Sequence, residues 1–328
     1  MSVSEKTIDL LGIGNAILDV LAYTEDSFLE SWEMRKGDMA LIDEARAEAI
    51  YNELGQTKEV SGGSVANSVA GLAMLGGTAA FIGRVKDDQF GKLYQHDLRS
   101  VGVQYDMAPL KEGLPTGCSY ILVTPDGERT MNTYLGAGSE IYPDDIDEAL
   151  VAQSKVVFGE GYQWSGDHNI AAMEKAFALA KKHNTKVAFS LSAVFCVELY
   201  REQFKALLDG TIDILFANDA EIQALYPDMA WEDLVDHLQG KAEIIALTRG
   251  EHGSLIITKD ARLPIAPQPV SKVTDATGAG DLYAAGFLYG YTRGLPLARC
   301  GELGSLCAAQ IIQQLGARSL EPLDRLVA

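Results

Sequence analysis

Short, β-rich apolar runs alternate along this chain with longer segments of helical periodicity. Runs that are apolar on both faces and separated by helices are typical of a parallel sheet covered on both sides. We therefore expect a doubly wound α/β fold with a mainly parallel sheet flanked by helices. The predicted strands are 8–14, 79–85, 155–161, 186–192, 212–218 and 243–250, with 254–258 as a hairpin partner. The predicted helices are 43–54, 64–75, 90–100, 168–183, 200–208, 219–226, 279–293 and 296–315.

Two stretches, 17–42 and approximately 106–136, interrupt this alternation. The first is predicted to be extended, with a turn that contains Trp32. The second contains Pro-Asp-Gly at 125–127, whose turn chemistry predicts a hairpin. We expect the two stretches to form a small β-sheet that covers the strand ends as a lid, so that residues 1–328 make one domain.

Acidic residues outnumber basic residues by 46 to 27, which gives a formal net charge of −19. Such a surface repels polyanions, so neither nucleic acid nor an anionic membrane is an expected partner. No apolar run reaches the roughly 18 residues of a membrane span, and the first residues do not resemble a signal peptide. We expect a cytoplasmic protein that acts on small molecules, as a monomer or a homodimer.

The segment TDATGAGD, residues 274–281, is the strongest candidate for chemistry. Gly278, Ala279 and Gly280 precede a predicted helix, and the free N–H groups at such a helix start bind phosphate. A carboxylate beside an anion site, here Asp281, is useful when it takes a proton from an attacking hydroxyl. The positive end of the helix is expected to lower the pKa of Asp281. The competing interpretation is a flexible loop in which Asp281 only caps the helix.

Two other nucleotide-binding patterns are not met. No Walker loop is present, because no GK[ST] follows a glycine-rich turn. Gly-Ile-Gly at 12–14 follows a predicted strand, but Ile17 occupies the third glycine position of the dinucleotide fingerprint.

Three motifs, in this order along the chain, resemble those of the ribokinase-like (PfkB-type) carbohydrate and nucleoside kinases. They are GNAILD (14–19), SGGSVANSVAGLAMLG (61–76) and the GAGD of residues 278–281. The resemblance covers essentially the whole chain. Within the family, FSLSAVF (189–195) and DILFANDAEIQAL (213–225) most resemble the adenosine kinases. The resemblance implies an ATP-dependent kinase with Asp281 as the catalytic base.

The resemblance implies an acceptor site built from the first two motifs. Asn15 and Asp19 match positions that bind the sugar, and a carboxylate can accept hydrogen bonds from two vicinal hydroxyls. Gly63 and Asn67 match positions where the backbone approaches the sugar and adds a polar contact. The alternatives are a solvated charge for Asp19 and a glycine turn before a packed helix for Gly63.

Aromatic residues near strand ends distinguish a nucleoside from a simple sugar. Phe195 matches an adenosine-kinase position that packs on the base, and Tyr162 and Trp164 are candidates for a second aromatic face. Ordinary core packing is the alternative for all three.

The resemblance also implies a site for the donor nucleotide. Asn218 and Glu221 match an NxxE motif that positions Mg²⁺ and phosphate, with Glu221 holding the metal through water. The alternative is a capping box in which the two side chains serve only the helix. The remaining implied ATP-binding residues are Thr248, Gly250, Gly253, Asp275, Cys307, Ala308 and Ile311. A monovalent-cation site near Asp275 and Thr277 also follows from the resemblance.

The expected reaction transfers the γ-phosphoryl group of ATP to a primary hydroxyl. The expected acceptor is the 5′-hydroxyl of adenosine, and the product is then AMP. A sugar kinase for ribose, fructose or a related carbohydrate is the first alternative. A non-catalytic nucleoside-binding module on the same fold is the second. The sequence leaves the choice between ATP and another donor open.

Overall fold

The larger of two sheets has eight strands in residues 6–327, the part of the chain that this computed structural model describes. The strand order is β13-β12-β11-β10-β9-β8-β1-β5, and pairing is parallel except for β11–β12 and β12–β13. The strands are β1 (Ile8–Ile13), β5 (Ala79–Ile82), β8 (Ser154–Glu160), β9 (Lys186–Ser190), β10 (Ile214–Asn218), β11 (Ile244–Thr248), β12 (Ser254–Ile257) and β13 (Arg262–Ile265).

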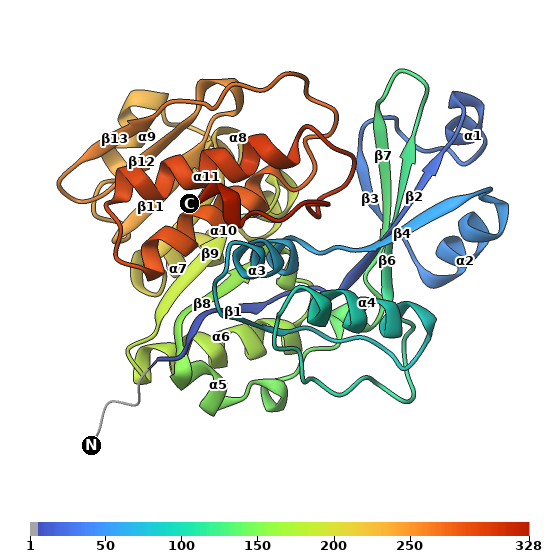
Figure 1. Cartoon of the computed structure of the whole chain (residues 1–328), viewed down its shortest axis with the longest axis horizontal. Coiled ribbons are helices and arrows are strands. Elements are labelled where there is room, and N and C mark those ends of the chain that lie inside the picture. The colour runs from blue at the N-terminus through green and yellow to red at the C-terminus, as the bar shows by residue number, and fades with distance from the viewer. Residues whose placement is uncertain (1–5, 328) are drawn as a thin grey trace.

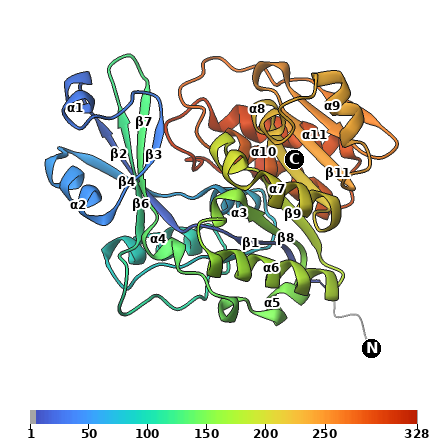
Figure 2. The ribbon, with the colours of Figure 1, turned by 180° about the vertical axis from the view of Figure 1, so that it is seen from behind.

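Helices cover both faces of this sheet, as Figures 1 and 2 show from opposite sides. Neighbouring residues of a strand point to opposite faces, so Leu10 and Leu11 of β1 belong to two different hydrophobic cores. The first core is covered by α3 (Ser64–Met74), α4 (Gln89–Ser100), α10 (Ala279–Thr292) and α11 (Leu297–Ile311). The second is covered by α5 (Glu148–Gln153), α6 (Asp167–Lys182), α7 (Val194–Gly210), α8 (Asp219–Leu225) and α9 (Trp231–Leu238). The predicted fold class is confirmed.

The smaller sheet, called the lid below, stands beside the larger one (Figure 1). Its strand order is β3-β7-β6-β2-β4. The strands are β2 (Ile17–Tyr23), β3 (Met39–Leu41), β4 (Thr57–Ser61), β6 (Gly117–Val123) and β7 (Arg129–Tyr134). The lid also carries α1 (Asp26–Ser31) and α2 (Glu44–Glu53), whose residues Leu29 and Ile50 are buried.

The lid differs in two ways from the sequence expectation. Residues 17–42 are not extended throughout, because α1 forms within them and buries Leu29. Strand β4 lies outside both predicted stretches and pairs antiparallel with β2. In the larger body, the helix predicted at 200–208 begins already at Val194, and α5, α9 and β13 were not predicted.

The central strands end where the two sheets meet, and this position defines the site. The carboxyl ends of β1, β8, β9, β10 and β11 are followed by polar or glycine-containing loops. The first turns of α3 and α10 lie at the same edge. No helix in residues 6–327 combines the length and the hydropathy of a membrane span.

Candidate active site

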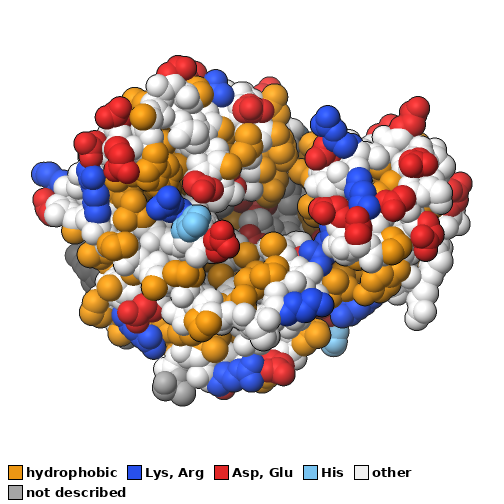
Figure 3. Space-filling view, turned by 90° about the horizontal axis from the view of Figure 1, so that it is seen from above, with side chains coloured by type: hydrophobic (Ala, Val, Ile, Leu, Met, Phe, Trp, Pro, Cys, Tyr) orange, Lys and Arg blue, Asp and Glu red, His pale blue; other side chains and the backbone are white. Residues whose placement is uncertain are grey.

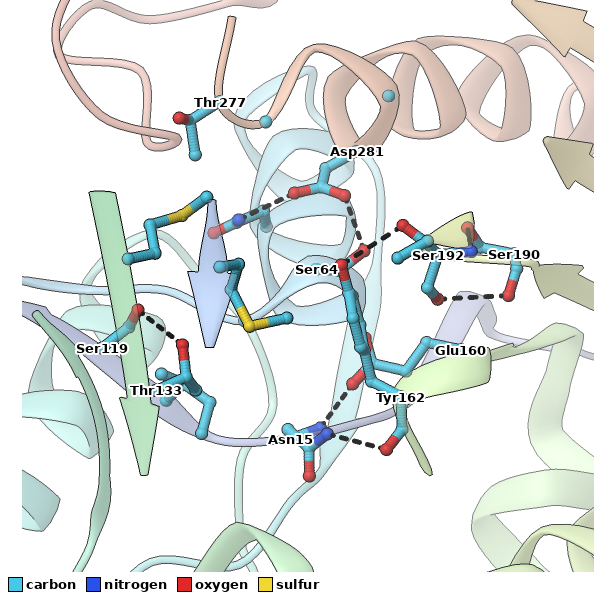
Figure 4. Close-up of a pocket in the computed structure, with 18 of the residues that line it drawn as sticks. Asn15, Ser64, Ser119, Thr133, Glu160, Tyr162, Ser190, Ser192, Thr277 and Asp281 are labelled. Atoms are coloured by element: carbon cyan, nitrogen blue, oxygen red, sulfur yellow. Dashed lines mark hydrogen bonds between the residues drawn. The ribbon is translucent and has the colours of Figure 1, made fainter. Parts of the chain in front are cut away.

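A cavity of about 550 Å³ lies between the lid and the ends of the central strands. Figure 3 looks into the hollow between the two parts of the molecule, and Figure 4 shows its lining. Residues from segments far apart in the sequence meet there. The lining includes the predicted loop residues Gly278, Ala279, Gly280 and Asp281, and all the predicted acceptor residues, Asn15, Asp19, Gly63, Asn67, Tyr162 and Phe195.

Asp281 lies in the first turn of α10 but does not cap it. The N-cap residue is Gly278, whose φ of +78° suits glycine. The Ser64 hydroxyl donates to Oδ1 of Asp281 at 2.6 Å (Figure 4). Asn67 Nδ2 donates to Oδ2 at 2.9 Å. Both donors come from the start of α3, so the carboxylate is held by another helix and faces the cavity. The capping interpretation is therefore wrong.

Burial raises the pKa of Asp281 to about 6, although the hydrogen bonds from Ser64 and Asn67 and the charge of Arg318 act to lower it. The expectation of a lowered pKa was wrong, because desolvation between α3 and α10 outweighs the effect of the helix N-terminus. A carboxylate with this pKa is a better base at neutral pH than an exposed aspartate, and it is still mostly ionised.

Asp19 projects from lid strand β2 into the same cavity. Its carboxylate has no hydrogen-bond partner among the described residues, and it packs against Gly62, where a Cβ would collide with Oδ2 and push the carboxylate aside. Burial raises the pKa of Asp19 to about 7, the charge of Arg318 lowers it, and Asp281 and Asp275 raise it further. An unpartnered carboxylate in a cavity is suited to accept hydrogen bonds from a ligand.

Glu160, at the end of β8, joins the two glycine motifs. Its carboxylate accepts the N–H of Asn15 at 2.7 Å and the N–H of Val65 at 2.8 Å. The Asn15 side chain is already hydrogen-bonded within the protein, because Gln163 donates to its Oδ1 at 2.9 Å. The amide of Asn67 differs, since its Oδ1 is buried without a partner among the described residues. Asn67 therefore holds Asp281 through Nδ2 and leaves Oδ1 available to accept a hydrogen bond from a ligand.

The position of Gly63 admits no other residue without strain. Its φ is +89°, and a Cβ there would collide with the carbonyl oxygen of Asn15. We expect Gly63→Ala to lower the free energy of unfolding by about 1–3 kcal/mol, the range for a non-glycine residue in such a conformation. Urea denaturation measures this loss. Gly55→Ala is the matched control, because a Cβ at Gly55 meets nothing within 4 Å. Equal stability of the two variants would contradict the strained position.

Tyr162 and Phe195 form an aromatic corner of the cavity, with ring centroids 6.0 Å apart. The Tyr162 hydroxyl donates to the carbonyl of Ser192 at 3.2 Å, which orients its ring. Trp164 does not belong to this corner. It is buried in the core against Phe189 and Phe204, so its prediction as an aromatic wall was wrong.

Asn218 and Glu221 form the capping box that the sequence offered as an alternative. Asn218 Oδ1 accepts the N–H of Glu221 at 2.8 Å, while Glu221 accepts from the backbone and side-chain nitrogens of Asn218 at 3.0 and 2.8 Å. Both residues nevertheless line the cavity. Burial raises the pKa of Glu221 to about 7.

A second cavity, of about 340 Å³, adjoins the first. The two share Thr248, Ala279, Gly280 and Tyr283, so the first turn of α10 is the boundary between them. Of the predicted donor residues, this second cavity is lined by Thr248, Gly250, Gly253 and Ala308.

Three other predicted donor residues lie elsewhere. Cys307 and Ile311 are fully buried with Leu282 on the core side of α11, and the cavity is lined instead by Ser305, Ala308, Ala309 and Ile312. The prediction that Cys307 and Ile311 line the donor site was wrong, because both lie on the side of α11 that faces the core. Asp275 is buried beneath the loop and lines neither cavity.

Sequence reasoning did not find Ser64, Glu160, Arg129 or Arg318. Arg318 donates to the carbonyls of Ser61 and Ala66 at 3.0 and 2.9 Å, which brings a positive charge behind Asp19 and Asp281. The only local signal was for Ser64, which directly follows Gly63 in the glycine motif.

Comparisons with known proteins agree with this geometry. The model of the pfkB family carbohydrate kinases matches residues 36–324. The chain belongs to this family. It is therefore a phosphotransferase that uses ATP as co-substrate and a hydroxyl group as acceptor.

Individual relatives include kinases for different acceptors. The crystal structure of adenosine kinase from Sinorhizobium meliloti is 44% identical, has a TM-score of 0.93 and covers 98% of each chain. Adenosine kinase from Saccharomyces cerevisiae is 27% identical over 94% of this chain and 96% of its own length. The 5-dehydro-2-deoxygluconokinase of Bacillus licheniformis is also 27% identical, over 97% of this chain and 94% of its own length.

Proposed function

We propose that this kinase transfers the γ-phosphoryl group of ATP to the 5′-hydroxyl of adenosine and forms AMP. The observation that carries the proposal is the pair of adjoining cavities with the start of α10 as their boundary. Asp281 faces the larger cavity, which is the acceptor side. A phosphoryl group that is transferred from the second cavity to the larger one passes beside the backbone N–H groups of this helix turn.

The chemistry of the larger cavity favours a nucleoside. Asn67 Oδ1 is buried without a partner among the described residues and can accept a hydrogen bond from a ribose hydroxyl, and the Asp19 carboxylate lines the same cavity and can accept others. Tyr162 and Phe195 supply an aromatic surface, and the lid adds apolar side chains. These include Ile17, Met39, Leu41, Ile121 and Met131. A free sugar offers no flat apolar group for such walls, whereas a purine does.

Different groups in the first turn of α10 accept the proton and stabilise the charge of the transferred phosphoryl group. Asp281, held by Ser64 and Asn67, accepts the proton of the attacking hydroxyl. The backbone N–H groups of Gly280 and Asp281, at the helix start, donate to the transferred phosphoryl group. The lid covers the acceptor, which limits access of water and thereby hydrolysis of ATP.

Mg²⁺ is proposed to accompany ATP, as in phosphoryl transfer generally, where it neutralises charge on the phosphates. Both carboxylate oxygens of Glu221 accept hydrogen bonds from Asn218, so this residue fits a metal only through bound water. Among residues 6–327 no group of three or more acidic, histidine or cysteine side chains is placed to bind a metal. The phosphates themselves would supply the remaining ligands.

A panel of acceptors tests the proposal through ADP release in a coupled assay with MgATP. Adenosine should give the highest kcat/KM, followed by other purine nucleosides, while ribose, fructose and 5-dehydro-2-deoxygluconate should give far lower values. The sugar-kinase alternative rests on a 5-dehydro-2-deoxygluconokinase that is 27% identical to this chain, the same identity as the adenosine kinase from Saccharomyces cerevisiae. It predicts the reverse order, and a non-catalytic module predicts no acceptor-dependent ADP release at all.

The acid limb of the pH profile should reflect the two site carboxylates. Their pKa values are about 6 for Asp281 and about 7 for Asp19, and both act in the ionised form. Activity is therefore lost as the pH falls, and kcat/KM for adenosine should decline below about pH 7 and more steeply below about pH 6. Asp19→Asn should reduce the upper part of this limb without abolishing it, because Glu221 lines the same cavity and its pKa is also raised to about 7. A profile that is flat from pH 5 to 8 would argue against both assignments.

A further inference from the structure

One contact joins the lid to the loop that precedes α10. Arg129, the first residue of lid strand β7, forms an ion pair through Nη1 with Oδ1 of Asp275. Its Nη2 donates to the carbonyl of Thr274 at 3.0 Å. Only 13% of the Arg129 side chain and 2% of the Asp275 side chain are exposed. The guanidinium thus forms two contacts with a loop that is 146 residues away in the sequence.

Both oxygens of the Asp275 carboxylate already accept hydrogen bonds from protein groups. Oδ1 also accepts the N–H of Thr277 at 2.7 Å, and Oδ2 accepts the N–H of Gly316 at 2.6 Å. A monovalent cation would need oxygen atoms that are free to face it. Here the Asp275 oxygens and the Thr274 carbonyl already face N–H donors. The residues present do not fit the cation site that the family resemblance implied.

We propose that the guanidinium of Arg129 takes the place of a monovalent cation in this kinase. Asp275 brings a negative charge beneath a loop that receives phosphate, and this charge has to be balanced. Arginine is always protonated and offers several donors in one plane, so it can balance Asp275 and order Thr274 at the same time. Because Arg129 belongs to the lid, the balancing charge arrives when the lid is in place and needs no ion from solution.

The proposal makes the enzyme independent of potassium. The initial rate of the wild-type enzyme should be the same in potassium chloride and in tetramethylammonium chloride at an ionic strength of about 0.1 M. Arg129→Ala should lower kcat by about tenfold or more, because it leaves a buried carboxylate without its counter-charge. Potassium, but not tetramethylammonium, should then restore part of the rate, because the freed oxygens of Asp275 and Thr274 can bind the ion. Arg129→Lys should keep an intermediate rate without potassium.

Two further variants make the assignment specific. Arg129→Ala combined with Asp275→Asn should lose the response to potassium, because the charged ligand is gone. Arg299→Ala is the matched control, since Arg299 is half-exposed and, within residues 6–327, pairs only with Glu302 of its own helix. It should behave as the wild type. Hydrogen exchange without any acceptor gives an independent readout: Arg129→Ala should speed exchange in 129–134 and 274–277, and potassium should slow it again in 274–277.

Two results would overturn the proposal. One is a saturable stimulation of the wild-type enzyme by potassium, and the other is an Arg129→Ala variant whose rate and exchange do not respond to potassium. The inference rests on the kinase activity of the family and not on adenosine as acceptor. The assay uses whichever compound of the panel turns over fastest, so a wrong acceptor assignment would not imitate either result.

Discussion

Replacing Asp281 with asparagine should lower kcat by a factor of about 10²–10⁴, the usual contribution of a general base. The affinity for ATP should stay within several-fold, because Asp281 faces the acceptor cavity and not the second one. Asparagine fits the position. Its oxygen can accept from Asn67, and its nitrogen can donate to the hydroxyl of Ser64, so the loss should be in chemistry and not in folding.

Single-turnover kinetics and ATP titration separate the two effects. Asp233→Asn is the matched control, because Asp233 also lies in the first turn of a helix but is exposed and lines neither cavity. It should leave kcat unchanged. Near-normal turnover of Asp281→Asn would remove Asp281 as the base.

Replacing Asp19 with alanine should raise the KM for adenosine by about 100-fold, if two hydroxyls each lose a hydrogen bond to a charged acceptor worth about 1.5 kcal/mol. The KM for ATP should change by no more than several-fold, because Asp19 lines only the acceptor cavity. Steady-state kinetics with each substrate varied in turn give both values.

A modified acceptor sharpens this test. The wild-type enzyme should prefer adenosine to 2′-deoxyadenosine, because Asp19 is proposed to accept a hydrogen bond from the 2′-hydroxyl, and Asp19→Ala should treat the two compounds nearly alike. Equal increases in both KM values, or an unchanged preference in the variant, would place Asp19 outside the sugar site.

Most of the larger sheet was predictable because its strands are buried on both faces and form continuous apolar runs. The elements that were missed carry weaker patterns. Strand β4, TKEVS, is an edge strand of the lid and is only partly buried, and α5 has six residues. Elements this short are stabilised mainly by tertiary contacts, which leave little trace in local sequence.

The candidate site was predictable where its parts are local motifs. The glycines and Asp281 follow from helix-start chemistry, and the acceptor residues follow from family resemblance. Arg318, Glu160 and Arg129 act through partners that lie more than 90 residues away, so no spacing indicates them. The pKa of Asp281 shows the same limit, because a helix start is visible in a sequence whereas burial against α3 is not.

The central claim, phosphoryl transfer to the 5′-hydroxyl of a nucleoside in the cavity beneath the lid, is tested most directly by identifying the product. Phosphorus NMR of a reaction with MgATP and adenosine should show stoichiometric AMP and ADP from the wild-type enzyme. The Asp281→Asn variant should give neither product on the same time scale, and 5′-deoxyadenosine should inhibit without being phosphorylated. Rapid formation of a sugar phosphate from the panel, with no AMP from adenosine, would contradict the account.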